Sequence, residues 1–326
     1  MKLQILVPQY KETDDIIKPL LDSIEVQQNV DLKNDVGVII VNDGTDVHLS
    51  QELLSRYTYP IEYYLNEHKG VSATRNACLD RATADYVMFC DADDLFCSAF
   101  GLFLVFSRID AGGFDTLVSD FIEEVKDKAT GKFQYMTHQA DCTFVHGKIH
   151  NRQYLLRNNI RWDDRLTLHE DGYFNTLCQK LARTTVRCST PFYLWKWRDN
   201  SVCRGNSEWV LKTYEHYILG SEALVEALLQ RGKTQAAQDC VTAAVLRTYF
   251  TMSTPDWVNQ KDQQHRVQTE NLMRDFYLKF KALYESTPEE TKVKTVKPLK
   301  DAMYGQGLMW EVVTFEGWLK QLGVGD

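Results

Sequence analysis

Three acidic residues crowd the end of one apolar segment, in the run Val87-Met88-Phe89-Cys90-Asp91-Ala92-Asp93-Asp94. Carboxylates this close repel one another unless a cation or a hydrogen-bonding ligand compensates their charge. Magnesium and manganese ions prefer oxygen ligands and often share one or two carboxylates with substrate phosphates. The run therefore suits a divalent cation that neutralises the leaving phosphate of a nucleotide diphosphate. The alternative is an acidic turn in which one Asp caps the next helix.

Polar residues also follow two other apolar segments, as Pro8-Gln9-Tyr10 and as Asn42-Asp43-Gly44. In an open α/β sheet, ligands bind beyond the carboxyl ends of the strands. An Asp at such an end can accept hydrogen bonds from a nucleobase or a ribose. Because an Asp-Gly pair is often only a turn, Asp43 has that simpler interpretation as well.

Between these two regions lies the stretch His68-Lys69-Gly70-Val71-Ser72-Ala73-Thr74-Arg75-Asn76. Gly70 permits close backbone approach, and Ser72 is a residue type that caps helices. Arg75 then falls in the first turn of a helix, where it could reach a phosphate or a nucleobase. A solvated Arg at a helix start is the alternative.

The elements that would position these residues alternate as in a βαβ protein. Apolar runs predict strands at 3–7, 36–41, 61–65 and 86–90, and helical spacing predicts helices at 14–27, 50–57, 71–82 and 98–109. The near-continuous apolar run at 36–41 is typical of a parallel strand covered on both faces. The sequence thus predicts a mixed, mostly parallel sheet flanked by helices.

The chain changes character after about residue 205. The section at 115–204 mixes short strands with helices at 152–158 and 172–181. Beyond it, amphipathic segments predict helices at 209–230, 234–251, 257–284 and 310–322, with breaks at Gly232, Pro255, Pro288 and Pro298. We therefore expect an α/β domain at 1–205 and a helical C-terminal region at 206–326.

Composition limits the classes of protein that fit. The 326 residues are 44% hydrophobic and 25% charged, as in an ordinary globular protein, and no apolar stretch approaches the roughly 20 residues that span a bilayer. The N-terminal apolar run is too short for a signal peptide. Eight scattered cysteines without a CxxC pair argue against zinc and favour reduced thiols in the cytoplasm. A net charge of −8 argues against extensive electrostatic binding of nucleic acid.

Read in order, these motifs resemble the family 2 glycosyltransferases, which have the GT-A (Rossmann-like) fold. The resemblance covers about the first 205 residues and continues through the motifs Val145-His146-Gly147-Lys148-Ile149-His150-Asn151-Arg152, His169-Glu170-Asp171 and Tyr193-Leu194-Trp195-Lys196-Trp197-Arg198 with Ser201. One departure is Lys11, which stands where the family usually has Asn. This departure weakens the assignment of the first loop but not that of the acids.

The resemblance implies an inverting transfer of sugar from a nucleotide donor, with UDP-sugar the favoured donor, assisted by Mn²⁺ or Mg²⁺. By matching position, residues in the first half of the 1–205 region would bind the donor, and the acidic residues that follow Cys90 would bind the metal. The implied donor-binding residues are Pro8, Tyr10, Asp43, Arg75 and Asp91, and the implied metal ligands are Asp91, Asp93 and, less clearly, Asp94.

Glu170-Asp171 matches the second acidic motif of the family, in which the Asp is the general base. A carboxylate beside the acceptor hydroxyl takes its proton as the new bond forms, an effect of about 10²–10⁴ in rate. Capping of a helix ahead of Gly172 is the alternative, because acids favour a helix N-terminus. We interpret Asp171 as the base, with Glu170 beside it.

A patch of aromatic and basic residues follows this motif. Aromatic faces suit sugar rings and Arg suits phosphate, so the patch could bind the acceptor or a phosphate, although Trp also anchors cores. Its members are Trp195, Trp197, Arg198 and Arg204. Both interpretations stay open.

A nucleotidyltransferase remains possible because its sheet is similar, although Pro8-Gln9-Tyr10-Lys11-Glu12 is not the Gly-rich, basic N-terminal loop that it usually has. The sequence leaves two further functions open. The first is transfer of sugar to hydroxymethylated bases in DNA, for which Lys292, Lys294, Lys297 and Lys300 could contact phosphate, although Glu289 and Glu290 beside them favour a solvated helix face. The second is a nucleotide-sugar-binding protein without catalysis, which the intact acids disfavour. We expect a cytoplasmic enzyme that transfers a sugar to a hydroxyl of a glycan or glycoconjugate.

Overall fold

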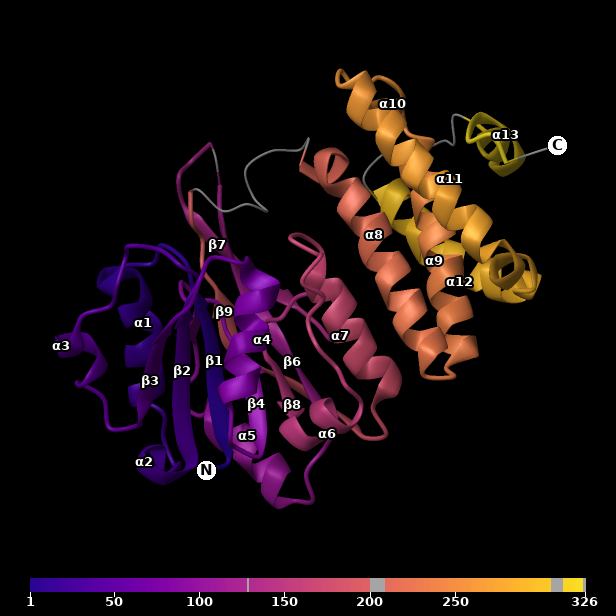
Figure 1. The fold of residues 1–326 in the computed structure, drawn as a ribbon. Coiled ribbons are helices and arrows are strands. Elements are labelled where there is room, and N and C mark those ends of the chain that lie inside the picture. Colours follow the sequence, from indigo (N-terminus) through magenta and orange to yellow (C-terminus); the bar gives the residue numbers. More distant parts are fainter. Residues whose placement is uncertain (128, 200–208, 306–312, 325–326) are drawn as a thin grey trace. The chain divides into compact units, whose positions relative to one another are not determined.

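The computed structural model describes residues 1–127, 129–199, 209–305 and 313–324. The chain divides into two compact units, Met1–Val202 and Cys203–Asp326. The first unit is a sheet flanked by helices, and the second is built of helices (Figure 1). The mostly parallel sheet flanked by helices is therefore confirmed. Ser201 and Arg204 lie outside the described residues.

Within the described residues, nine strands form one sheet in the order β3-β2-β1-β4-β8-β6-β9-β5, with β7 paired to β6. The strands are β1 Leu3–Gln9, β2 Val36–Asn42, β3 Ile61–Leu65, β4 Tyr86–Phe89, β5 Leu95–Phe96, β6 Thr116–Lys126, β7 Phe133–His138, β8 Lys148–Asn151 and β9 Thr185–Trp195. β1 runs parallel to β2 and β4, and β6 runs parallel to β9. β8 is antiparallel to both β4 and β6. The carboxyl ends of β1, β2, β4, β6 and β9 therefore meet at one edge.

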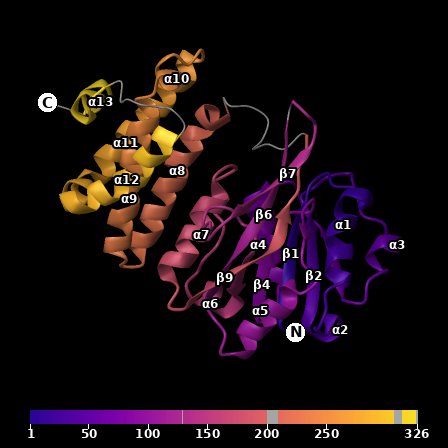
Figure 2. The ribbon, with the colours of Figure 1, turned by 180° about the vertical axis from the view of Figure 1, so that it is seen from behind.

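Helices cover both faces of this sheet. They are α1 Asp14–Glu25, α2 Leu32–Asp35, α3 Gln51–Leu54, α4 Val71–Arg81, α5 Gly101–Asp110, α6 Arg152–Arg157 and α7 Glu170–Leu181. Helix α4 lies in front of the sheet in Figure 1, and α5 lies in front of it in Figure 2, which is the view from behind. All seven residues of β2 are buried, because a central parallel strand is covered on both sides. The apolar residues Ile17, Leu20, Leu21 and Ile24 form the buried face of α1.

The second unit contains α8 Trp209–Gln230, α9 Thr234–Met252, α10 Pro255–Val258, α11 Gln263–Glu285, α12 Glu289–Gly305 and α13 Phe315–Gln321. Its core lies between α8, α9 and α11, where Val225, Val245 and Phe276 are almost fully buried. Among the described residues, no helix is both long enough and apolar enough to cross a membrane.

Most predicted elements are present. The first residues of the helix predicted at 310–322 lie outside the described residues, and α13 covers its later part. Two details of the helical unit were wrong. The helix predicted at 257–284 is two helices, because Pro255 starts α10 and the Asp262 side chain caps α11 by accepting from the backbone N–H of His265 at 3.0 Å. Pro298 was predicted to break a helix but lies inside α12. An interior proline forfeits a backbone hydrogen bond, and here packing of α12 against α9 outweighs that loss.

The turn after β2 generates a prediction about stability. Gly44 has a φ of +69°, and a Cβ there would meet the backbone N of His68 at 2.2 Å. Gly131 has a φ of +70° with nothing within 4 Å of such an atom, so it serves as the matched control. We expect Gly44→Ala to lower the free energy of unfolding by about 3 kcal/mol or more, and Gly131→Ala by only about 1 kcal/mol. Urea denaturation of the two variants checks this, and equal losses would contradict the close approach of the two loops.

Candidate active site

Arg75 lies at the centre of the acidic residues that the sequence singled out. Its side chain is 4% exposed and extends from the first half of α4. Nη1 donates to carboxylate oxygens of Glu170 and Asp171, both at 2.9 Å, and Nη2 donates to Asp91 at 3.0 Å. The guanidinium carbon also lies 4.4 Å from the ring centroid of Trp162. Acids separated by about eighty positions in sequence are therefore held together by one cation.

The charge of Arg75 depends on these neighbours. Burial by itself would lower the pKa of Arg75, but Asp171, Asp91 and Glu170 outweigh it and raise that pKa above its ordinary value. An uncompensated buried charge would be very costly, so the guanidinium and the carboxylates need each other. Arg75 is thus a buried member of the site, and the alternative of a solvated Arg at a helix start is excluded.

Asp171 is placed as a titratable carboxylate between two donors. One oxygen accepts from Arg75, and the other accepts from the backbone N–H of Val145 at 3.0 Å. Burial raises the pKa of Asp171 to about 7, with Arg75 opposing the rise and Glu170 and Asp91 adding to it. A carboxylate with a pKa near neutrality is suited to accept a proton in one step and release it in another.

The loop 143–147 connects Asp171 to the acids that follow β4. Lys148, the first residue of β8, is almost fully buried, and its Nζ donates to the carbonyl oxygens of Phe144 and His146. Asn175 of α7 donates to the carbonyl oxygens of Thr143 and Phe144 at 3.1 and 2.9 Å. Because these side chains satisfy the carbonyls of the loop, its N–H at Val145 is held toward Asp171.

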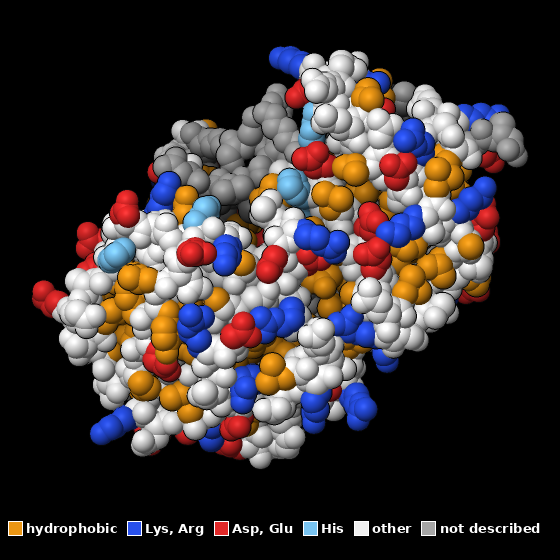
Figure 3. Space-filling model, in the orientation of Figure 1, with side chains coloured by type: hydrophobic (Ala, Val, Ile, Leu, Met, Phe, Trp, Pro, Cys, Tyr) orange, Lys and Arg blue, Asp and Glu red, His pale blue; other side chains and the backbone are white. Residues whose placement is uncertain are grey.

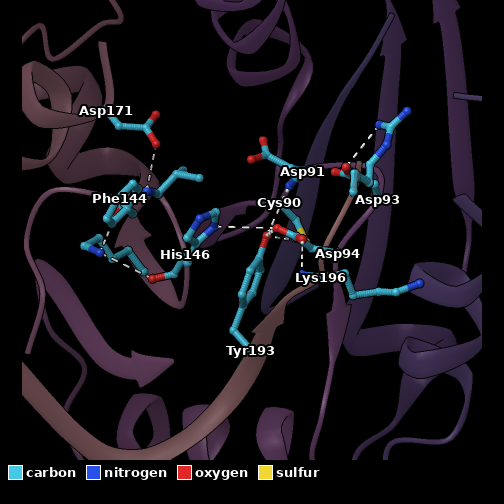
Figure 4. Close-up of polar contacts among 12 residues, drawn as sticks. Cys90, Asp91, Asp93, Asp94, Phe144, His146, Asp171, Tyr193 and Lys196 are labelled. Carbon is cyan, nitrogen blue, oxygen red and sulfur yellow. Dashed lines mark hydrogen bonds and ion pairs between the residues drawn. The ribbon is translucent and has the colours of Figure 1, made fainter. Parts of the chain in front are cut away.

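The three acids after β4 have different surroundings. Asp94 is buried and accepts from the Tyr193 hydroxyl at 2.6 Å and from the Lys196 backbone N–H at 2.9 Å (Figure 4). Burial, followed by repulsion from Asp93 and Asp91, raises the pKa of Asp94 well above its ordinary value. Both of these donors are neutral groups.

Asp93 has a cationic partner instead. Arg198 donates to Asp93 at 3.0 Å and to Glu12 at 3.1 Å, so it joins the end of β9 to the loops after β1 and β4. Burial and repulsion from Asp91 raise the pKa of Asp93, and Arg198 opposes that rise. The predicted phosphate contact Arg198 is therefore occupied by two carboxylates.

One group among the described residues could hold a metal ion. Asp91, Asp94 and His146 each offer a ligand atom, and these atoms lie within 4.8 Å of one another. Two carboxylates with an imidazole suit Mn²⁺, and the excess negative charge beside Asp94 fits a cation. Figure 4 shows His146 facing the Asp94 carboxylate, with Nδ1 3.6 Å from it. Two of the three predicted ligands belong to this group, and Asp93 lies outside it.

Three of the five residues predicted for the donor, Pro8, Tyr10 and Asp43, lie at the ends of β1 and β2, whereas Arg75 lies on α4 and Asp91 follows β4. Asp43 is buried and accepts from the backbone N–H groups of Lys69 and Gly70 at 2.9 and 3.1 Å. His68 lies 2.9 Å from Asp43 and stacks on the exposed ring of Tyr10, with ring centroids 5.1 Å apart. These bonds tie the turn after β2 to the start of α4. Pro8 lies in β1, paired in register with Val41 of β2, and Tyr10 follows directly after the end of this strand.

The two described Trp residues of the predicted acceptor patch differ. The Trp195 ring packs against the Phe144 and His146 rings, with centroids 5.1 and 5.0 Å away. Trp197 donates from its indole to Asp199 at 3.0 Å. Both side chains are partly exposed. Trp195 therefore packs on the 143–147 loop and still has surface that is accessible to solvent.

Sequence reasoning gave no role to three residues that build the site: His146, Trp162 and Tyr193. Each contacts a predicted site residue, yet a lone buried His or aromatic in one sequence cannot be told from a core residue. His146 and Tyr193 lie within motifs that resemble the family, and this position was the one sequence feature that could have identified them as site residues.

Comparison with known proteins gives this arrangement a family. The family model "Glycosyl transferase family 2" matches residues 4–178. A relative named Glycosyltransferase GlyA, from Streptococcus pneumoniae serotype 4 (strain ATCC BAA-334 / TIGR4), is 23% identical over 267 residues, which is 71% of this chain and 34% of the relative. The chain thus spans about a third of the length of that relative.

Solved structures share the fold. The crystal structure of S. aureus TarS in complex with UDP matches with a TM-score of 0.64 and 18% identity, over 94% of this chain and 92% of that one. The complex with UDP-GlcNAc matches with a TM-score of 0.65 and 19% identity, over the same shares. The chain accordingly has the GT-A fold.

The loop that supports Asp171 generates a second prediction. Lys148→Met removes the donor to the His146 carbonyl and one of the two side-chain donors to the Phe144 carbonyl, so we expect the free energy of unfolding to fall by about 1–3 kcal/mol. Lys180→Met, on the exposed side of α7, should change it by less than about 0.5 kcal/mol. Chemical denaturation of both variants measures the difference. Equal stability of the Lys148→Met variant would mean that the loop carbonyls find other donors.

Proposed function

The chain belongs to glycosyl transferase family 2, a family of enzymes, and on that premise we propose that it transfers a sugar from a nucleotide-diphosphate donor to a hydroxyl acceptor with inversion. The observation that carries this proposal is the junction at Arg75, where Asp91 and Asp171 converge within 3.0 Å of one guanidinium. One acid then lies beside the leaving group and the other beside the nucleophile.

In the proposed mechanism, Asp171 is the general base. Its carboxylate takes the proton of the acceptor hydroxyl while that oxygen forms a bond to the anomeric carbon. The bond between the anomeric carbon and the phosphate oxygen breaks in the same step, and the electron pair leaves with the nucleoside diphosphate. Attack and departure on opposite sides invert the configuration. The N–H of Val145 and Arg75 orient the Asp171 carboxylate throughout.

For the donor, we propose a UDP-sugar whose nucleobase lies near Tyr10, Asp43 and His68. The amides at Lys69 and Gly70 fix the Asp43 carboxylate at the end of β2, and the Tyr10 ring is exposed for stacking. UDP and UDP-GlcNAc are bound in the TarS structures, which supports the choice of donor class.

Asp91, Asp94 and His146 would hold Mn²⁺ or Mg²⁺, which when bound neutralises charge on the departing diphosphate. Asp93 was also predicted as a metal ligand. Because its carboxylate is bonded to Arg198, the test below includes an Asp93 variant. The acceptor that we propose is a glycan or glycoconjugate, and the expected location is the cytoplasm.

The lysines that raised the DNA alternative are partly neutralised. Lys292 lies 3.7 Å from Glu289, and Lys294 lies 2.7 Å from Glu290. On the face shown in Figure 3, Lys and Arg side chains are interspersed with Asp and Glu. Neither feature favours a nucleic-acid acceptor.

Metal-dependent donor binding provides the first test of the proposal. We expect UDP to raise the thermal midpoint of the chain more with Mn²⁺ than without it. Asp91→Asn and Asp94→Asn should weaken the apparent Mn²⁺ affinity in this assay by about tenfold or more. Asp93→Asn is the comparison, and a loss of the same size there would add Asp93 to the ligands. Stabilisation by UDP that ignores Mn²⁺ in the unchanged chain would contradict the metal site.

The pKa of Asp171 provides the second test. Since the base acts only when deprotonated, kcat/KM should rise with pH up to about 7 and level off above it. Asp171→Asn should lower transfer by about 10²-fold or more while UDP affinity stays within about twofold. Glu170→Gln removes a negative neighbour that raises the pKa of Asp171, so the inflection should move to lower pH. Near-full turnover by Asp171→Asn would refute the base assignment.

A further inference from the structure

The ring of Trp162 lies against the buried guanidinium of Arg75. The guanidinium carbon is 4.4 Å from the ring centroid, and Trp162 is 2% exposed. Phe174 stacks on the same ring, with centroids 4.1 Å apart and an angle of 2° between the planes. Since one face of the indole cannot hold both groups at these distances, Arg75 and Phe174 lie on opposite faces. The attraction of a cation to an aromatic face is strongest where both are removed from water, as they are here.

Hydrogen bonds fix only one end of the guanidinium of Arg75. Nη1 and Nη2 donate to the three carboxylates of the site, whereas the buried Nε has no hydrogen-bond partner among the described residues. The carboxylates therefore hold the guanidinium from one side. The Trp162 ring is the surface that opposes tilting of its plane.

Helix α4, which carries Arg75, also holds the loop that carries Trp162. Asn76 accepts from the backbone N–H of Trp162 at 3.0 Å and donates to its carbonyl oxygen at 2.9 Å. One turn earlier on α4, the Ser72 hydroxyl donates to the carbonyl oxygen of Leu166 at 2.8 Å. Ser72 and Asn76 are both buried, and neither has a part in the proposed function. Their bonds explain why polar residues flank Arg75 on this helix: they fix the indole over the guanidinium.

The place of Arg75 matters to Asp171 because of its charge. Burial raises the pKa of Asp171, Arg75 opposes that rise, and repulsion from Glu170 and Asp91 adds to it. Lys148 is a further cation whose charge interacts with Asp171. A guanidinium that tilts away would leave the Asp171 carboxylate with a weaker counter-charge, and the remaining carboxylates would then favour its protonated form.

We propose that Trp162 is a positioning residue of the reaction: its ring fixes the plane of the Arg75 guanidinium so that Nη1 stays on Asp171, and Asn76 holds Trp162 in place. This inference rests on the proposed function, because it concerns the residue that is assigned there as the base. Trp162 acts through Arg75 and touches no reacting atom. The electron-rich face of the indole is the feature used, so an aliphatic side chain cannot replace it.

A pH titration of the Asp171 carboxylate in the full chain tests the inference. The titration is followed by carbon NMR of chain labelled at the Asp carboxyl groups, and the Asp171 signal is assigned by its loss in Asp171→Asn. We expect the midpoint to rise by about one pH unit in Trp162→Leu, which removes the aromatic face. The rise should be smaller in Trp162→Phe, because Phe attracts a cation less strongly than Trp. Asn76→Ala, which releases the loop, should move the midpoint in the same direction.

Phe174→Leu is the matched control, because it removes a buried ring from the other face of the same indole and leaves the contact with Arg75. Its midpoint should stay within about 0.3 pH unit of that of the unchanged chain. An unchanged midpoint in Trp162→Leu, or an equal rise in Phe174→Leu, would overturn the positioning role. If Trp162→Leu does not fold, Trp162→Phe and Asn76→Ala decide by the same criterion.

The pH dependence of transfer separates positioning from a purely structural role. In Trp162→Leu, kcat/KM should fall about tenfold at pH 6 and less than about twofold at pH 9, where the base is deprotonated in both chains. A loss of the same size at every pH would count against positioning. Absence of transfer in the unchanged chain would reject the proposed function, and the NMR midpoints would still decide whether Trp162 acts on Asp171 through Arg75.

Discussion

The buried guanidinium of Arg75 is the interaction on which the site depends. Without it, Asp91, Glu170 and Asp171 would be three carboxylates in one partly buried site. Their mutual repulsion would separate them or raise their pKa values until they became protonated. With it, the loop after β4 and the start of α7 are fixed against α4. The geometry of the site thus depends on the ion pairs of Arg75 with these three carboxylates, which form at the carboxyl end of the sheet.

The loop 143–147 adds a second constraint that acts on both halves of the site. Lys148 and Asn175 satisfy its carbonyl oxygens from within, which leaves the N–H of Val145 for Asp171 and the ring of His146 for Asp94. Burial lowers the pKa of Lys148 to about 8, so this support combines hydrogen bonds with a charge that is costly to bury. A shift of the loop would move the proposed base and a proposed metal ligand together.

Much of this arrangement could be predicted because it is local. The strands that end at Asn42 and before Asp91, and the helix that begins at Val71, follow from apolar runs and turn residues, and their parallel pairing brings the ends to one edge. The partners of Arg75 could not be predicted in this way. Whether a polar side chain is solvated or buried depends on residues far away in sequence, such as Trp162, and periodicity carries no information about them.

The run after β4 illustrates the same limit most sharply. The sequence does not distinguish Asp91, Asp93 and Asp94, but their partners in the structure differ. Asp91 pairs with Arg75 and Asp93 with Arg198. Asp94 accepts from the Tyr193 hydroxyl and the Lys196 backbone N–H, and it lies 3.6 Å from the His146 imidazole. Asp91 is 33% exposed and Asp94 is 1% exposed, so Asp91 would supply the accessible ligand atom of a cation site and Asp94 the buried one. The difference between these acids, rather than their number, favours a metal ion at this strand end.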